Sequence, residues 1–159
     1  EKNIALFTKY RVFSETELRA RHDILLENYC KILHIEALTM LDMARHDILP
    51  TVSSYQGSLA KVICDKRAAC MEIDCTYETE TLRKISELTN LSYKNTNVLE
   101  SAVLFAEQLE DMETRAQVYR HDVFTAMQAL RASVDQLEGM VDAKQWPYPQ
   151  YGELLFSVR

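Results

Sequence analysis

The feature that most constrains the fold is a run of apolar and small residues that recur every three or four positions between Leu88 and Leu130, with one gap between Leu91 and Val98 where Asn95 falls in phase. The run comprises Leu88, Leu91, Val98, Ala102, Phe105, Leu109, Met112, Ala116, Tyr119, Val123, Ala126 and Leu130. This spacing places one stripe of side chains on one face of an α-helix, with charged residues such as Glu107 and Arg115 at the other positions. A helix cannot bury such a stripe by itself. The sequence therefore predicts partner helices elsewhere in the chain.

The chain contains few residues that interrupt helices. Its 159 residues include only three glycines and three prolines, and Pro50 is the single proline before the tail. Turns in all-β and α/β proteins depend on these residues. We therefore expect an all-α protein, an up-and-down bundle of about four long helices. We expect one domain over residues 1–159, with a lead-in at 1–14, the bundle at 15–132, and a short helix and tail at 133–159.

Local signals set the boundaries of the first helix. Ser14 and Glu17 make a capping box, and Phe13 and Leu18 are placed to form a hydrophobic staple around it. The helix that follows is apolar nearly all round in its middle, at Leu33, Ile35, Leu38 and Leu41. This pattern predicts that the middle of the helix is covered on more than one side.

Single residues mark the later boundaries, and they give long helices at 15–49, 51–74, 78–110 and 111–132. Pro50 lacks an N–H and clashes with the carbonyl of His46, so the sequence predicts a kink or a break there and leaves both open. Thr76 and Thr79 are candidate N-caps of the third long helix, and Asp111 is the candidate N-cap of the fourth.

The last part of the chain is rich in aromatic residues. Ser133 and Gln136 make a second capping box, which predicts a short helix over 135–141. Two prolines separated by one aromatic residue then enforce an extended tail. We expect the tail to form a strap across the bundle, with docking onto another subunit or domain as the alternative. The candidate packing or interface residues are Trp146, Tyr148, Tyr151, Leu154 and Phe156.

Charge and composition exclude several function classes. The formal net charge of −6 argues against non-specific binding to nucleic acid or to an anionic membrane. No apolar run is long enough to span a bilayer, and no signal peptide is visible at the start. The chain lacks an initiating Met, as a processed chain or a fragment would. The spacing of the four cysteines matches no disulfide scaffold, so we expect reduced thiols in a cytoplasmic protein.

Several residue patterns could hold a metal. The tripeptide Arg-His-Asp occurs at 21–23, 45–47 and 120–122, each time before a β-branched residue. His-Asp pairs can bind divalent metals, but charged triplets are also common on solvated helix faces, and we favour that reading. Cys30 and His34 lie four residues apart, yet structural zinc needs four ligands, so a buried thiol beside a polar histidine is the simpler interpretation.

Other kinds of catalytic site find no support in the sequence. A di-iron bundle requires Glu-x-x-His motifs, and no glutamate in this chain has a histidine three residues later. The only glycines, Gly57, Gly139 and Gly152, cannot form a phosphate-binding loop. We therefore assign no catalytic, cofactor-binding or metal-ligating residue in this chain.

Several stretches resemble the C-terminal region of type III glutamine synthetases. These are Asn28-Tyr29 with 35–40, Asp47-Ile48-Leu49-Pro50, Ala126-Met127-Gln128-Ala129-Leu130-Arg131, and above all Val141-Asp142 with the tail from Trp146 to Phe156. The resemblance covers essentially the whole chain. One position departs from it: the family often has a proline where this chain has Thr125, so we expect a straighter last long helix here.

The resemblance implies a fragment of a larger enzyme. Type III glutamine synthetases are large cytoplasmic dodecamers that join glutamate and ammonia with ATP and divalent metals, Mg or Mn. Their metal-binding carboxylates and nucleotide site lie upstream, and no position here matches them. The resemblance thus implies a non-catalytic domain that supports subunit stability or assembly, with the upstream catalytic region of the same polypeptide and further copies as partners.

Two other functions remain open at this point. The chain could be a free-standing helical interaction module that binds a partner helix, which a start codon just before Glu1 would favour. It could also be a small helical metalloenzyme built on the His-Asp pairs, which would hold stoichiometric metal.

Overall fold

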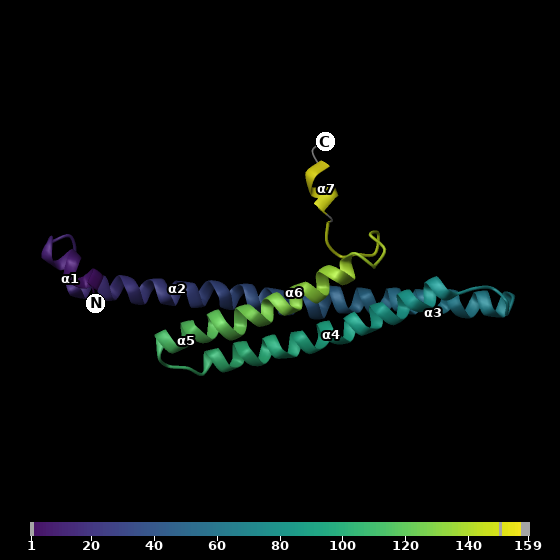
Figure 1. Cartoon of the computed structure of the whole chain (residues 1–159), viewed down its shortest axis with the longest axis horizontal. Coiled ribbons are helices and arrows are strands. Elements are labelled where there is room, and N and C mark those ends of the chain that lie inside the picture. The colour runs from purple at the N-terminus through teal and green to yellow at the C-terminus, as the bar shows by residue number, and fades with distance from the viewer. Residues whose placement is uncertain (1, 150, 157–159) are drawn as a thin grey trace.

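The structure is a computed structural model that describes residues 2–149 and 151–156, and in this part of the chain it contains helices and no strands (Figure 1). The predicted all-α bundle is confirmed. The helices are α1 (Lys2–Lys9), α2 (Glu15–Asp42), α3 (Leu49–Ala69), α4 (Thr76–Glu107), α5 (Met112–Val118), α6 (Phe124–Glu138) and α7 (Tyr151–Phe156), with two π-helical segments, η1 (Met43–Ile48) and η2 (Tyr119–Val123).

The long helices form three rods. The segments α2, η1 and α3 follow one another without a break, so the two helices that the sequence placed on either side of Pro50 are one continuous rod. The helix α4 runs back along this rod, and α5, η2 and α6 form the third rod (Figure 1). The break between the second and third rods falls at the predicted N-cap, Asp111. The carboxylate of Asp111 accepts a hydrogen bond from the N–H of Thr114 at 2.8 Å.

Pro50 is accommodated by a π turn. The pentapeptide Arg-His-Asp-Ile-Leu occurs at 21–25 and again at 45–49, but the first copy is α-helical and the second enters η1. The next residue differs, because Leu26 follows the first copy and Pro50 the second. In η1 the N–H of Leu49 bonds to the carbonyl of Ala44, five residues back. This wider turn removes the close approach between the proline ring and the carbonyl four residues before it.

The second π turn lies in a related sequence without a proline. In η2 the N–H of Phe124 bonds to the carbonyl of Tyr119, and Thr125 occupies the position that corresponds to Pro50. The third rod is therefore not a regular helix, although it lacks the proline. A proline is not required to keep a π turn in this bundle, and packing of the rod must hold η2.

Two boundary predictions need correction, the end of α3 and the cap of α4. The helix α3 ends at Ala69, before the predicted residue 74, because Cys70 is extended, with φ −160° and ψ 120°. The helix α4 is capped neither by Thr76 nor by Thr79. Asp74 instead accepts hydrogen bonds from the N–H and the hydroxyl of Thr76, at 2.8 and 2.6 Å. The capping box of Ser14 and Glu17 is confirmed, with both reciprocal hydrogen bonds formed.

The short helix predicted over 135–141 is also wrong. The helix α6 continues through Ser133 and ends at Glu138. Ser133 is 2% exposed, and its hydroxyl donates to the carbonyl of Leu130 and accepts from the hydroxyl of Ser92. A serine that serves as an N-cap must have extended backbone, which Ser133 cannot have in the middle of a helix.

Two clusters of buried residues form the core. The first joins α2 and the start of η1 to α4 and the third rod, and consists of Cys30, Leu33, Ala37, Leu41, Ala44, Leu99, Val103, Ala106, Ala116, Tyr119, Val123, Ala126, Met127 and Leu130. The second joins η1 and α3 to α4, the end of α6 and the tail, and consists of Ile48, Val52, Leu59, Ile85, Leu88, Leu137, Val141 and Trp146.

The stripe predicted from Leu88 to Leu130 is buried only in part. Its second half, from Ala116 to Leu130, lies in the first cluster. In its first half, however, Leu91, Val98 and Phe105 are 46%, 58% and 52% exposed. The buried face of α4 instead passes through Ile85, Leu88, Ser92, Thr96, Leu99, Val103 and Ala106.

Candidate interaction site

The tail begins by packing against the bundle. Trp146 is 8% exposed and belongs to the second core cluster, together with Ile48 and Val52. Tyr148 packs against the same cluster, and its hydroxyl donates a hydrogen bond to the carboxylate of Asp47 in η1. Burial and this hydrogen bond raise the pKa of Tyr148 to about 12. The first part of the tail is therefore attached to the π turn of the first rod.

The end of the tail leaves the bundle. The helix α7 stands away from the three rods (Figure 1), and its Leu154 and Phe156 are 60% and 85% exposed. The backbone of Tyr151 begins α7, but its side chain lies outside the described residues. Of the candidate packing or interface residues, the structure thus places Trp146 and Tyr148 on the bundle and Leu154 and Phe156 in solvent.

The first rod also carries an apolar face that the bundle leaves uncovered. The members of this face on α2 are Ile24, Ile32, Ile35 and Leu38, which are 55%, 57%, 64% and 47% exposed. Their spacing places them on one side of the helix, and Leu33, Ala37 and Leu41 occupy the opposite, buried side. The middle of α2 is apolar nearly all round and was predicted to be covered on more than one side, but among the described residues nothing covers this second side.

The uncovered face continues onto α4 at Leu104, which is 53% exposed. Leu104 lies one turn after Glu100 and one turn before Glu107, so the three residues share a face of α4. Both glutamates reach across to the first rod, where Glu107 lies 3.5 Å from His34 and Glu100 pairs with Arg45. Because Leu38 follows His34 by one turn, Leu38 and Leu104 lie at the same level between these two polar contacts.

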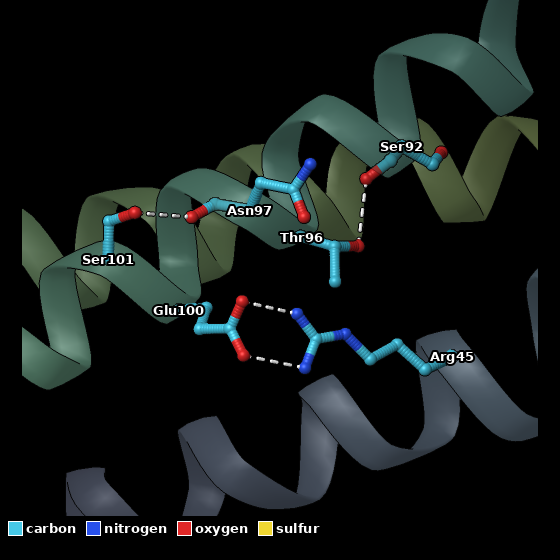
Figure 2. Close-up of polar contacts among 6 residues, drawn as sticks. All are labelled: Arg45, Ser92, Thr96, Asn97, Glu100 and Ser101. Atoms are coloured by element: carbon cyan, nitrogen blue, oxygen red, sulfur yellow. Dashed lines mark hydrogen bonds and ion pairs between the residues drawn. The ribbon is translucent and has the colours of Figure 1, made fainter.

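Arg45 and Glu100 form the more regular of the two polar contacts. The guanidinium donates two parallel hydrogen bonds to the carboxylate, at 2.7 and 2.5 Å, as Figure 2 shows. This contact lowers the pKa of Glu100 and raises the pKa of Arg45. Both side chains remain partly exposed, so the pair fixes the register of the two rods more than it stabilises them.

The other contact belongs to a polar group at the far end of the first cluster. His34 Nδ1 and the hydroxyl of Tyr119 are hydrogen-bonded at 3.0 Å, and Arg115 donates to the carbonyl of Leu109. The side chains of His34, Tyr119 and Arg115 line an open cavity of about 310 Å³, together with Cys30 and Glu107. Burial raises the pKa of the Cys30 thiol and of the Tyr119 hydroxyl, so both stay protonated near neutral pH. The hydrogen bonds of this group satisfy polar atoms where α2 meets the turn between α4 and α5.

The Arg-His-Asp tripeptide at 21–23 lies in α2, and those at 45–47 and 120–122 lie in the π turns η1 and η2. The structure brings two of them together, because His22 of the first and Arg120 and His121 of the last line one open cavity of about 310 Å³. Within residues 2–149 and 151–156, no group of three or more His, Cys, Asp or Glu side chains is placed to hold a metal ion. The thiols of Cys30 and Cys75 are buried, whereas Cys64 and Cys70 are exposed. In the described part of the chain, none of the helices is both long and apolar enough to cross a bilayer.

Comparison with known proteins identifies the family. Residues 1–67, which span α1, α2, η1 and most of α3, match the family model of the glutamine synthetase C-terminal domain. The whole chain is 33% identical over 159 residues to a glutamine synthetase of Butyrivibrio fibrisolvens, and 98% of it aligns with a type-3 glutamine synthetase of Dictyostelium discoideum at 28% identity. The chain belongs to the family of type III glutamine synthetase C-terminal domains.

These relatives of the glutamine synthetase domain are much longer than the chain. The chain covers 23% of the Butyrivibrio protein and 22% of the Dictyostelium protein. A third relative, a glutamine synthetase of Bacteroides fragilis (strain YCH46), is 30% identical over 153 residues, which are 92% of this chain and 21% of the relative. The chain thus spans between a fifth and a quarter of the length of the curated relatives that it matches.

Proposed function

We propose that the chain is the non-catalytic C-terminal domain of a longer type III glutamine synthetase and that it supports the stability or assembly of that enzyme's subunits. The whole enzyme makes glutamine from glutamate, ammonia and ATP. Its catalytic carboxylates, its ATP site and its Mg or Mn ions belong to the region upstream of this domain. The partners of the domain are that catalytic region and further copies of the polypeptide in a cytoplasmic homo-oligomer, a dodecamer.

One observation carries this proposal: the stretch with the most specific resemblance to the family serves packing. Trp146 is buried among Ile48, Val52 and other residues of the second cluster, and Tyr148 is hydrogen-bonded to Asp47. The tail therefore closes the bundle and directs α7 outward, which are tasks of a supporting domain.

The test uses the full-length glutamine synthetase that contains this chain, with Trp146→Ala as the variant. Removing a buried tryptophan costs about 3–5 kcal/mol, so we expect fewer full-size assemblies in light scattering and a lower thermal midpoint. Tyr77→Ala is the matched control, because Tyr77 is 72% exposed and lies outside both core clusters. If Trp146→Ala leaves size, thermal midpoint and glutamine formation unchanged, the supporting role is wrong.

A further inference from the structure

We infer that the outer face, defined as Ile24, Ile32, Ile35 and Leu38 of α2 with Leu104 of α4, is the surface by which this domain docks onto the rest of its own polypeptide. This inference rests on the proposed function and names the surface that carries it. The five side chains are between 47% and 64% exposed.

The outer face is unusual because the same helix is apolar on two opposite sides. A helix at the surface of a bundle normally buries one stripe and presents polar residues elsewhere. In α2 the buried stripe of Leu33, Ala37 and Leu41 already fills the first cluster. Ile35 and Leu38 lie between those positions along the chain and on the other side of the helix, and they belong to neither core cluster. Between Ile24 and Ile35 this side also carries Lys31, whose charge is paired with Glu27. Exposed apolar side chains grouped as Ile32, Ile35 and Leu38 are mark interaction sites.

The charged residues at the edge of the outer face favour a largely apolar partner. The charged groups beside Leu38 and Leu104 are already engaged across the two rods, Arg45 with Glu100 and His34 with Glu107. The acid and the base of each contact are adjacent, so this border presents no single-sign charge to attract nucleic acid or an anionic surface. A complementary surface must therefore be largely apolar and close to neutral where it meets these residues.

The small number of residues in the outer face favours a partner that belongs to the same polypeptide. A free-standing protein interface uses about 20–30 residues on each side, far more than the five apolar residues here. A surface this small does not offset the loss of translational and rotational freedom when two separate molecules associate. Within one polypeptide the effective concentration of the two surfaces is high, on the order of millimolar for short linkers. Because the chain accounts for only 21–23% of its relatives, most of such a polypeptide lies outside this domain. We therefore identify the occupant as the remainder of the same polypeptide, rather than a second copy.

The experiment places a carboxylate on the outer face in two contexts. Ile35→Glu and Leu38→Glu are introduced separately into the 159-residue chain and into the full-length glutamine synthetase, and thermal midpoint, mass and glutamine formation are measured. Leu91→Glu is the matched control, since Leu91 is 46% exposed on α4 and lies outside the outer face. In the chain alone, all three variants should melt like the unsubstituted chain.

In the full-length enzyme, the two outer-face variants should lower the thermal midpoint and reduce the correctly assembled, active fraction about tenfold, because burying an unpaired carboxylate is costly. Leu91→Glu should not. If the outer-face variants are neutral in both contexts while Trp146→Ala still destabilises the enzyme, the docking surface is wrong and the supporting role stands. If the 159-residue chain alone forms a dimer that Ile35→Glu dissociates, a second copy occupies the outer face and our assignment of the partner is overturned.

Discussion

The hydroxyl of Tyr148 donates a hydrogen bond to the carboxylate of Asp47, which lies 101 residues earlier in the chain. Asp47 belongs to the π turn η1, where the first rod passes Pro50. The contact therefore connects the C-terminal tail to the irregular turn of the first rod. The hydrogen bond between Tyr148 and Asp47 and the burial of Trp146 hold the tail on the bundle up to the point where α7 departs.

The tail contact should weaken in alkaline solution. The pKa of Tyr148 is raised from 10.0 to about 12, first by burial and then by the hydrogen bond to Asp47. The neutral phenol is thus favoured in the folded state. The contribution of Tyr148 to the free energy of unfolding is therefore complete below pH 10 and is lost as the pH rises towards 12. We expect the unfolding free energy of the chain to fall over this range. Tyr148→Phe should be less stable at pH 8 and should show a smaller decrease between pH 10 and 12 in denaturant titrations.

The third rod should accept a proline at one position. Thr125 follows η2 as Pro50 follows η1, so the turn before it already has the wider hydrogen-bond pattern. A proline within a regular helix costs about 3 kcal/mol or more. We expect Thr125→Pro to cost much less than this and Gln128→Pro, in the regular part of α6, to cost the full amount. Equal losses for the two variants in urea unfolding would show that η2 does not prepare the rod for a proline.

The turn between the second and third rods should depend on Asp111. Its carboxylate accepts from the N–H and the hydroxyl of Thr114, and these hydrogen bonds lower its pKa from 3.8. A carboxyl group with a lowered pKa stabilises the fold above its ordinary pKa, and this contribution is lost as the pH falls through the lowered value. Asp111→Ala should lower the stability of the fold at pH 7, because the N–H of Thr114 loses its partner. Asp111→Asn should retain much of the cap but lose its acid dependence, which unfolding curves at pH 7 and pH 3 can separate.

Ser92 and Ser133 should be energetically coupled. Their hydroxyls are hydrogen-bonded at 2.9 Å between α4 and α6, where the two residues are 0% and 2% exposed. Each single substitution to alanine removes this hydrogen bond, so the second substitution should cost less than the first. We expect a coupling energy of about 0.5–1.5 kcal/mol in a double-mutant cycle. The distant pair Ser92 and Thr114 is a control that should show additive effects.

The boundaries that the sequence predicted correctly depend on neighbouring residues. Ser14 and Glu17 cap α2, and Asp111 caps α5, because each side chain bonds to backbone groups three residues away. At the start of α4 the sequence indicated Thr76 as a cap, but the N-cap position is Cys75, and Asp74 before it accepts a hydrogen bond from the N–H of Thr76. The start of α4 depends on where α3 ends, and that end is fixed by how the hairpin between α3 and α4 closes.

The buried face of α4 could not be predicted from hydrophobicity. Leu91, Val98 and Phe105 fit the apolar period, yet Ser92 and Thr96 are buried in their place. The hydroxyl of Thr96 is satisfied within its own helix by the carbonyl of Ser92 (Figure 2), and the hydroxyl of Ser92 is satisfied by Ser133 on α6. Small polar residues can be buried at low cost only when such partners exist. The partner on another helix is not visible in the local sequence.

The sequence by itself determined that this protein is helical, where α2 and α5 begin, and which enzyme family it resembles, because these properties reside in local patterns and recognisable stretches. Only the tertiary structure decided that Pro50 lies within a continuous rod, that Trp146 enters the core while Phe156 does not, and that Ile35 and Leu38 remain uncovered. The physical reason is that burial and helix continuity depend on which surfaces meet. An apolar residue in the sequence indicates a surface that is favourable to bury, and the arrangement of the rods decides whether another part of the domain covers that surface.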